Sequence, residues 1–228
     1  MNFVSPDQAE GLFGKNFFGP ADVERSFRGP VQQPLPPIPF PSDILREAAA
    51  EGFFLVFRDP AVGGAPFVLE RAVHSFPDLF DSRYLQKVGY QLKDEWGILL
   101  EPLARTETPR KGWALVRKQP LPGSANRTYQ EQTKLLRQWA QPWEVRGLQV
   151  RRRLAVEIVY DCLLVYLSRG ERLLEREWDW SASTTVDGGF LNVGGFGENG
   201  LQIFSYSGAV RHSALGVCPE IRNPLEEN

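Results

Sequence analysis

The sequence is poor in the residues that build most metal and disulfide sites. It has two cysteines and two histidines among 228 residues, and Cys162 and Cys218 lie far apart. No Cys-x-x-Cys, His-x-x-x-His or Cys/His cluster occurs, which excludes a zinc site built from local spacing. A disulfide-rich scaffold is excluded too, while one disulfide between the two cysteines stays open. We therefore expect no bound metal.

Long hydrophobic runs are also missing. The most apolar stretch, residues 155–167, is 13 residues long and contains Glu157 and Asp161, whereas a membrane-spanning helix needs about 20 mostly apolar residues. The N-terminus lacks the basic and apolar regions of a signal peptide. We expect a soluble cytoplasmic protein without membrane association.

Local motifs of catalysis and cofactor binding are absent as well. The sequence has no Gly-x-Ser-x-Gly elbow, no Walker A spacing and no EF-hand ligand spacing. Glycine-rich residues 187–189 and 194–200 are typical of hairpin turns, where glycine adopts positive φ. We expect no cofactor. These absences favour a non-enzyme, while an enzyme whose site is assembled from distant residues stays open.

The first part of the chain predicts short elements joined by proline. Two short helices fall within residues 5–28, and six prolines in residues 30–41 exclude a helix or central strand there. Ile38 and Phe40 favour a strap packed on the core, with a P-x-x-P ligand for an SH3-type domain as the alternative. The next predicted elements are a helix over 42–51, a strand over 53–57, a helix over 67–74 and a strand over 113–117.

Two longer helices follow, and then the pattern changes. Thr128 and Glu131 form a capping box that starts a helix running to about residue 140, before Pro142. A second helix is predicted over 149–169, apolar except for a narrow wet stripe. Residues 172–220 alternate aromatics with glycines, which predicts a β-meander with an Asn-Gly hairpin at residues 199–200. In one strand Trp178 and Trp180 share a face, either as core or as an aromatic platform.

Together these elements predict an α+β protein, with helices packed on a small mixed sheet and a C-terminal antiparallel β segment. We divide it into an N-terminal helical segment with the proline strap (1–41), an α+β core (42–170) and a C-terminal hairpin or meander segment (171–228). The three segments are expected to form one cooperative unit.

Charge is distributed unevenly. Residues 105–153 hold twelve Lys/Arg and three acids, a net of +9, against −11 for the rest of the chain. Basic residues mixed with tryptophan and tyrosine are typical of surfaces for single-stranded nucleic acid or another polyanion. The alternative is that basic and acidic segments pair within the fold. The predicted polyanion surface consists of Arg110, Lys111, Arg117, Lys118, Arg151, Arg152 and Arg153.

Two local patterns are candidates for chemistry. Gly123, Ser124, Asn126 and Arg127 precede a helix and together suggest an anion site, although an ordinary capped turn is favoured. Glu157 and Asp161, four residues apart on a helix, resemble a catalytic carboxylate pair. Arg153, four residues before Glu157, makes an ion-pair ladder the favoured alternative.

Several strings of the sequence resemble a known family. They are residues 36–40 (PPIPF), 54–59 (FLVFRD), 113–116 (WALV), the pattern PGSxNxxYxxQT from residue 122, Tyr160-Asp161 with 170–175 (GERLLE), and 195–200 (GFGENG). In this order they resemble a family of uncharacterised bacterial hypothetical proteins, over residues 17–217. The resemblance implies one cooperative unit in bacteria and no particular chemistry.

Three hypotheses for function follow. The leading one is a non-enzymatic protein-binding or structural module, because no local catalytic or metal signature is present. The second is nucleic-acid or polyanion binding through residues 105–153, with an affinity that falls steeply with salt. The third is an enzyme whose site is assembled from distant residues, and its candidates are Ser124, Asn126, Arg127, Glu157, Asp161 and His212.

Overall fold

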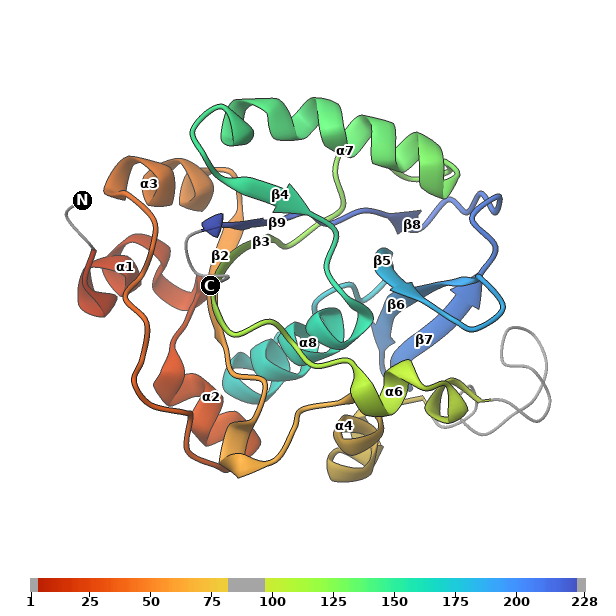
Figure 1. Ribbon diagram of the computed structural model, residues 1–228, viewed down its shortest axis with the longest axis horizontal. Coiled ribbons are helices and arrows are strands. Elements are labelled where there is room, and N and C mark those ends of the chain that lie inside the picture. The colour runs from red at the N-terminus through yellow and green to blue at the C-terminus, as the bar shows by residue number, and fades with distance from the viewer. Residues whose placement is uncertain (1–3, 82–96, 225–228) are drawn as a thin grey trace.

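The computed structural model describes residues 4–81 and 97–224, and it confirms the α+β class. Helices surround two mixed sheets of five and four strands (Figure 1). The expected strap is seen in residues 30–41, where Val31, Ile38 and Phe40 are buried. The Trp113 indole N–H donates to the Pro36 carbonyl at 3.1 Å, which holds the strap on the core. No helix in the described part of the chain is long and apolar enough to cross a bilayer.

The five-stranded sheet has the order β1-β2-β3-β9-β4. β2 (Phe53–Arg58) is buried along its whole length and pairs antiparallel with β3 (Gly112–Arg117), as the apolar runs predict. β1 (Phe17–Phe18) adds a parallel edge, whereas β9 (Glu220–Arg222) and β4 (Gln149–Arg151) add antiparallel strands on the other side.

The four-stranded sheet has the order β7-β6-β5-β8. β5 (Trp178–Thr184), β6 (Phe190–Gly197) and β7 (Gly200–Tyr206) form the expected meander. The hairpin between β6 and β7 lies at the predicted Asn-Gly site, where Gly200 has a φ of +105° that L side chains rarely adopt.

One late segment of the chain belongs to both sheets. β8 (Leu215–Gly216) pairs parallel with β5, and four residues later β9 enters the five-stranded sheet between β3 and β4. The C-terminal β segment therefore does not stay with the meander, because its last strand completes the sheet of the N-terminal half.

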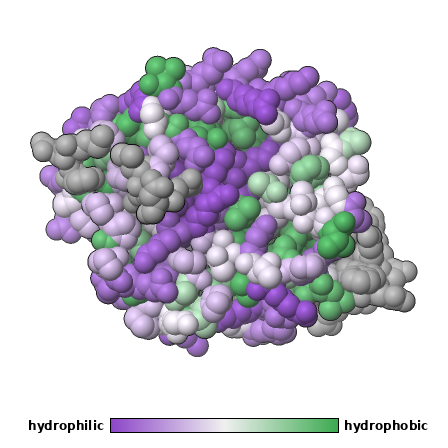
Figure 2. Space-filling model, in the orientation of Figure 1, coloured by the Kyte–Doolittle hydropathy of each residue, from purple (hydrophilic) through white to green (hydrophobic). Residues whose placement is uncertain are grey.

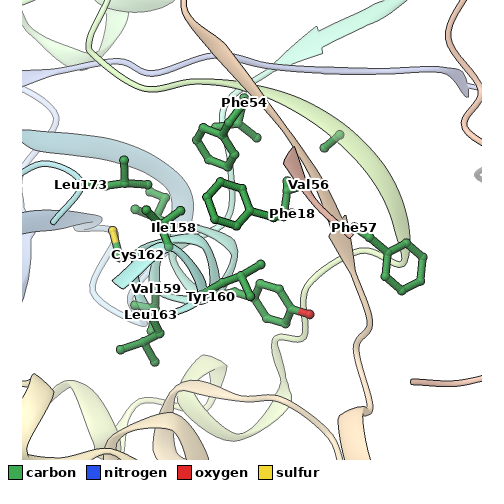
Figure 3. Close-up of a cluster of buried hydrophobic side chains, with 14 of the residues drawn as sticks. Phe18, Phe54, Val56, Phe57, Ile158, Val159, Tyr160, Cys162, Leu163 and Leu173 are labelled. Atoms are coloured by element: carbon green, nitrogen blue, oxygen red, sulfur yellow. The ribbon is translucent and has the colours of Figure 1, made fainter. Parts of the chain in front are cut away.

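A single helix, α8 (Ala155–Arg169), occupies the centre of the molecule. Its side chains Ile158, Val159, Cys162 and Leu163 lie in one apolar cluster with Phe54 and Leu173 (Figure 3). The remaining α-helices described here are α1 (Pro6–Phe13), α2 (Pro20–Phe27), α3 (Ser42–Ala50), α4 (Leu69–Ser75), α6 (Leu103–Thr106) and α7 (Tyr129–Glu144).

Two predicted helix boundaries were wrong. α7 continues through Pro142 to Glu144, because Trp143 is buried against Phe53 and Trp139 and this packing outweighs the missing N–H of the proline. The next helix begins at Ala155 instead of residue 149, because residues 149–151 pair with β9 as strand β4. Tertiary pairing has overridden the helical periodicity there.

Candidate functional site

Glu157 and Asp161, predicted to lie on a solvent-exposed polar stripe of α8, instead belong to a buried ionic network. Arg58, at the end of β2, is fully buried, and its Nε and Nη2 donate to the two Asp161 carboxylate oxygens at 2.8 and 2.6 Å. Its Nη1 donates to Glu220 of β9 at 2.5 Å. One guanidinium therefore ties α8 to two strands of the five-stranded sheet with charge-assisted hydrogen bonds.

Arg153 extends this network to the second sheet. Its two terminal nitrogens donate to Asp161 at 2.7 Å and to Asp179 of β5 at 2.8 Å. The other Asp179 oxygen accepts the Cys218 backbone N–H at 2.8 Å. Both sheets are thus bonded to α8 through alternating positive and negative side chains in the dry interior.

Two carboxyls of this network, Glu157 and Glu220, have strongly shifted pKa values, in opposite directions. Burial, reinforced by the nearby Glu220 carboxylate, raises the pKa of Glu157 to about 7. Three arginines around Glu220, one of them Arg58, outweigh its own burial and hold its pKa well below the ordinary value. Such shifts occur in catalytic sites and in structural ion networks alike.

The contacts of Glu157 decide between these two settings. Its carboxylate accepts the backbone N–H groups of Leu154 at 2.8 Å and Arg110 at 3.1 Å, and it has no solvent-exposed surface. Asp161 is equally enclosed. A substrate has no access to either carboxylate in this conformation.

Several basic residues within 105–153 make ion pairs with acids outside that segment. Arg151 pairs with Glu220, Lys118 lies 2.7 Å from Glu171, and Arg117 lies 3.9 Å from Glu51. Arg152 and Arg153 are buried. Arg110 has 40% of its side-chain surface exposed, and Lys111 is partly exposed. Figure 2 shows a hydrophilic band across the middle of the face in view, in the direction from which α8, β4 and β9 are seen near the centre of Figure 1.

The polar groups of the predicted anion turn are already engaged in hydrogen bonds within the protein. Gly123 has a φ of +74°, and the buried Ser124 hydroxyl accepts the Val217 N–H at 3.2 Å. The Arg127 side chain donates to the Gly123 carbonyl. At the start of α7 the Glu131 carboxylate already accepts the Thr128 N–H at 2.8 Å, as the predicted capping box requires. A bound anion would compete with that carboxylate.

The outer face of the four-stranded sheet carries a second kind of site. Asp179 points to Arg153, which precedes α8, so its neighbours on β5 point to the opposite face of the sheet. Cross-strand register adds residues of β6 and β7 to that face. We call this surface the aromatic face, which consists of Tyr129 of α7 together with Trp178, Trp180, Phe190, Phe204 and Tyr206.

The rings of the aromatic face form two groups. Tyr129 and Phe190 stack with centroids 3.8 Å apart, and Trp180 meets both edge-on. Trp178 stacks on Phe204 at 6.4 Å and meets the exposed His212 edge-on at 5.8 Å. None of the six rings belongs to the apolar clusters among the described residues. They form a separate layer in which Trp180 and Phe204 are buried and Trp178 and Phe190 are partly exposed.

Asn192 lies at the centre of this layer, between Trp180 and Phe204 in the cross-strand register. It is fully buried, and within the described residues neither its amide nitrogen nor its oxygen has a hydrogen-bond partner. The indole nitrogens of Trp178 and Trp180 are also buried without a hydrogen-bond partner among the described residues. A buried polar group without a hydrogen bond costs about 1–3 kcal/mol. The Asn192 amide and the two indole N–H groups therefore destabilise the fold as they stand.

Several predicted residues meet at one edge of the aromatic face. The Asn126 N–H donates to the His212 carbonyl at 2.9 Å, and the Arg152 guanidinium lies 4.1 Å from the Tyr129 ring centroid. Glu157 and Asp161 belong to the ionic network instead. Asn192 and Phe190 were missed, although the alternation of β6 already places both on the face shared by the two tryptophans.

No family model, curated protein or solved structure matches this chain. Among residues 4–81 and 97–224, no group of three His, Cys, Asp or Glu side chains is arranged to hold a metal ion.

Proposed function

We propose that this chain is a non-enzymatic bacterial protein of the cytoplasm that binds another protein through its aromatic face. The observation that carries the proposal is the layer of six aromatic rings separate from the two apolar clusters, in which Trp178 and Phe190 remain partly exposed. Tryptophan, tyrosine and arginine are the side chains enriched where protein interfaces concentrate their binding energy.

The enclosed ionic groups support a binding role over catalysis. The carboxylates of Glu157 and Asp161 have no exposed surface, and the Ser124 hydroxyl is engaged by Val217. A catalytic group must reach a substrate within hydrogen-bond distance. Of the six enzyme candidates only Asn126, Arg127 and His212 are exposed, and no candidate carboxylate or hydroxyl is accessible beside them. The partly exposed rings of Trp178 and Phe190 suit recognition.

The test uses the whole chain as bait in a bacterial lysate, followed by titration of the purified captured protein. The informative variants are Trp178→Ala and Phe190→Ala. Val145→Ala is the matched control, because Val145 is 88% exposed and lies beyond the aromatic face. Thermal unfolding checks that each variant keeps its fold.

We expect each aromatic variant to weaken binding at least tenfold, or about 1.4 kcal/mol, while the control binds like the parent chain. Equal binding by all four proteins would overturn the aromatic face as the interface. A thermal shift with heparin or a single-stranded oligonucleotide that disappears with salt would replace this proposal by polyanion binding. A shift with a nucleotide or metal would favour an enzyme.

A further inference from the structure

A small hollow lies between α2 and α4, away from the groups used above. Its wall is made by the rings of Phe27, Phe67 and Phe76, and its rim carries Arg71 and Ser75 of α4. The Phe27 ring lies 5.0 Å from Phe67 and 6.0 Å from Phe76, so the rings hold one another in place. The hollow therefore has an apolar wall and a polar rim.

The volume of the hollow limits what it can hold. It measures about 40 Å³, whereas pockets for cofactors and drug-sized ligands span about 300–1,000 Å³. One water-sized probe needs roughly 10–15 Å³. The space therefore fits the end of one aliphatic side chain and excludes a nucleotide or a flavin.

The rim specifies the charge of the occupant. The Arg71 Nη1 group donates to the carbonyls of Ala65 and Pro66, which fixes the guanidinium beside the hollow. Its Nε and Nη2 groups have no hydrogen-bond partner among the described residues, nor does the Ser75 hydroxyl on the same helix. Two adjacent guanidinium N–H groups match the two oxygens of a carboxylate.

We propose that this hollow binds the C-terminus of a partner protein that ends in an aliphatic residue. The side chain of that residue fills the hollow and packs against its wall of phenylalanine rings, and its α-carboxylate accepts hydrogen bonds from Arg71 and Ser75. A C-terminal residue carries both groups on one Cα, which suits a site whose apolar and cationic parts adjoin. Capture of a terminal carboxylate is an established mode of peptide recognition. The site is independent of the aromatic face.

The test titrates the ¹⁵N-labelled full chain with the peptide acetyl-Gly-Gly-Leu and follows backbone amide shifts by NMR. We expect saturable shifts around Phe67, Ala72 and Phe76, with a dissociation constant on the order of 1 mM for so small a contact. The C-terminal amide of the same peptide, and acetyl-Gly-Gly-Ser, should each bind at least fivefold more weakly.

Two arginine variants separate the site from general charge. Arg71→Gln should weaken binding at least tenfold, whereas Arg105→Gln removes an exposed arginine of the neighbouring α6 and should leave it unchanged. Equal binding of acid and amide peptides, unchanged binding by Arg71→Gln, or no shifts would overturn the proposal. Isovalerate binding as tightly as the peptide would overturn it in favour of a free carboxylate ligand. Trp178→Ala should bind the peptide normally, which distinguishes failure here from failure of the aromatic face.

Discussion

Replacing Arg58 by methionine tests whether the buried ionic network holds the two sheets and α8 together. Methionine has a similar length and apolar character, so packing is largely kept while the charge is lost. The change removes three hydrogen bonds at once, two to Asp161 and one to Glu220. It leaves these carboxylates with one positive partner fewer in an environment without water.

The expected loss follows from this geometry. Removing one partner of a buried, fully bonded pair costs about 3–5 kcal/mol, because a buried charge is left uncompensated. At about 2–4 °C per kcal/mol for a domain of this size, the melting temperature should fall by about 6–20 °C. The assay is urea unfolding followed by circular dichroism, with thermal unfolding alongside.

Arg146→Met is the matched control. Arg146 also contacts two acids, Asp43 at 2.7 Å and Glu47 at 2.5 Å, but all three side chains are at least 31% exposed. Each exposed pair contributes about 0–1 kcal/mol, so the loss of two pairs should lower the melting temperature by less than about 8 °C. If Arg58→Met were no more destabilised than Arg146→Met, the reasoning from burial would be refuted.

Two further predictions concern buried groups. The pKa of Glu157 is raised from 4.5 to about 7, so the folded chain holds a proton that the unfolded chain has released between these pH values. Stability should therefore fall by on the order of 3 kcal/mol as pH rises through this window and level off above pH 7. In urea unfolding at stepped pH, Glu157→Gln should flatten the slope of the unfolding free energy against pH. An unchanged slope would refute the assignment. The groups that act on this carboxyl are Arg58, Arg110, Arg151, Glu220 and Arg222. Cys162 and Cys218 are free and buried, with raised thiol pKa values, about 12 for Cys162. Neither should react with a thiol reagent in the folded protein, and both should react in guanidinium chloride; reaction at native conditions would contradict their burial.

The sequence predicted elements whose signal is local. The capping box at Thr128, the apolar run of β2 and the hairpin before Gly200 depend on neighbouring residues, and all three are present. The buried ionic network could not be predicted in the same way. Its members come from four separate regions of the chain, and a helical wheel treats a charged stripe as exposed unless its partners are known.

For the anion turn and the basic segment, too, the sequence did not reveal which distant residues would be the hydrogen-bond and ion-pair partners. Ser124 is satisfied by Val217, which lies 93 residues away in sequence, and Arg153 is satisfied by Asp161 and Asp179. Spacing within one segment reveals which donors are present, whereas their partners are set by the fold. The aromatic face was better indicated, because period-two alternation places Trp178 and Trp180 on one side of their strand.

The segment shared by both sheets has a consequence for the order of folding. β4 joins the five-stranded sheet only through β9, and β9 also pairs with β3, more than a hundred residues earlier in the chain. Closing such a long loop costs chain entropy before the stabilising strand contacts form, and this slows folding. We therefore expect the β5–β6–β7 meander, which pairs locally, to form early and the insertion of β9 to be the late step. Until then β3 and β4 expose unpaired strand edges, and the chain is most prone to aggregation in that interval.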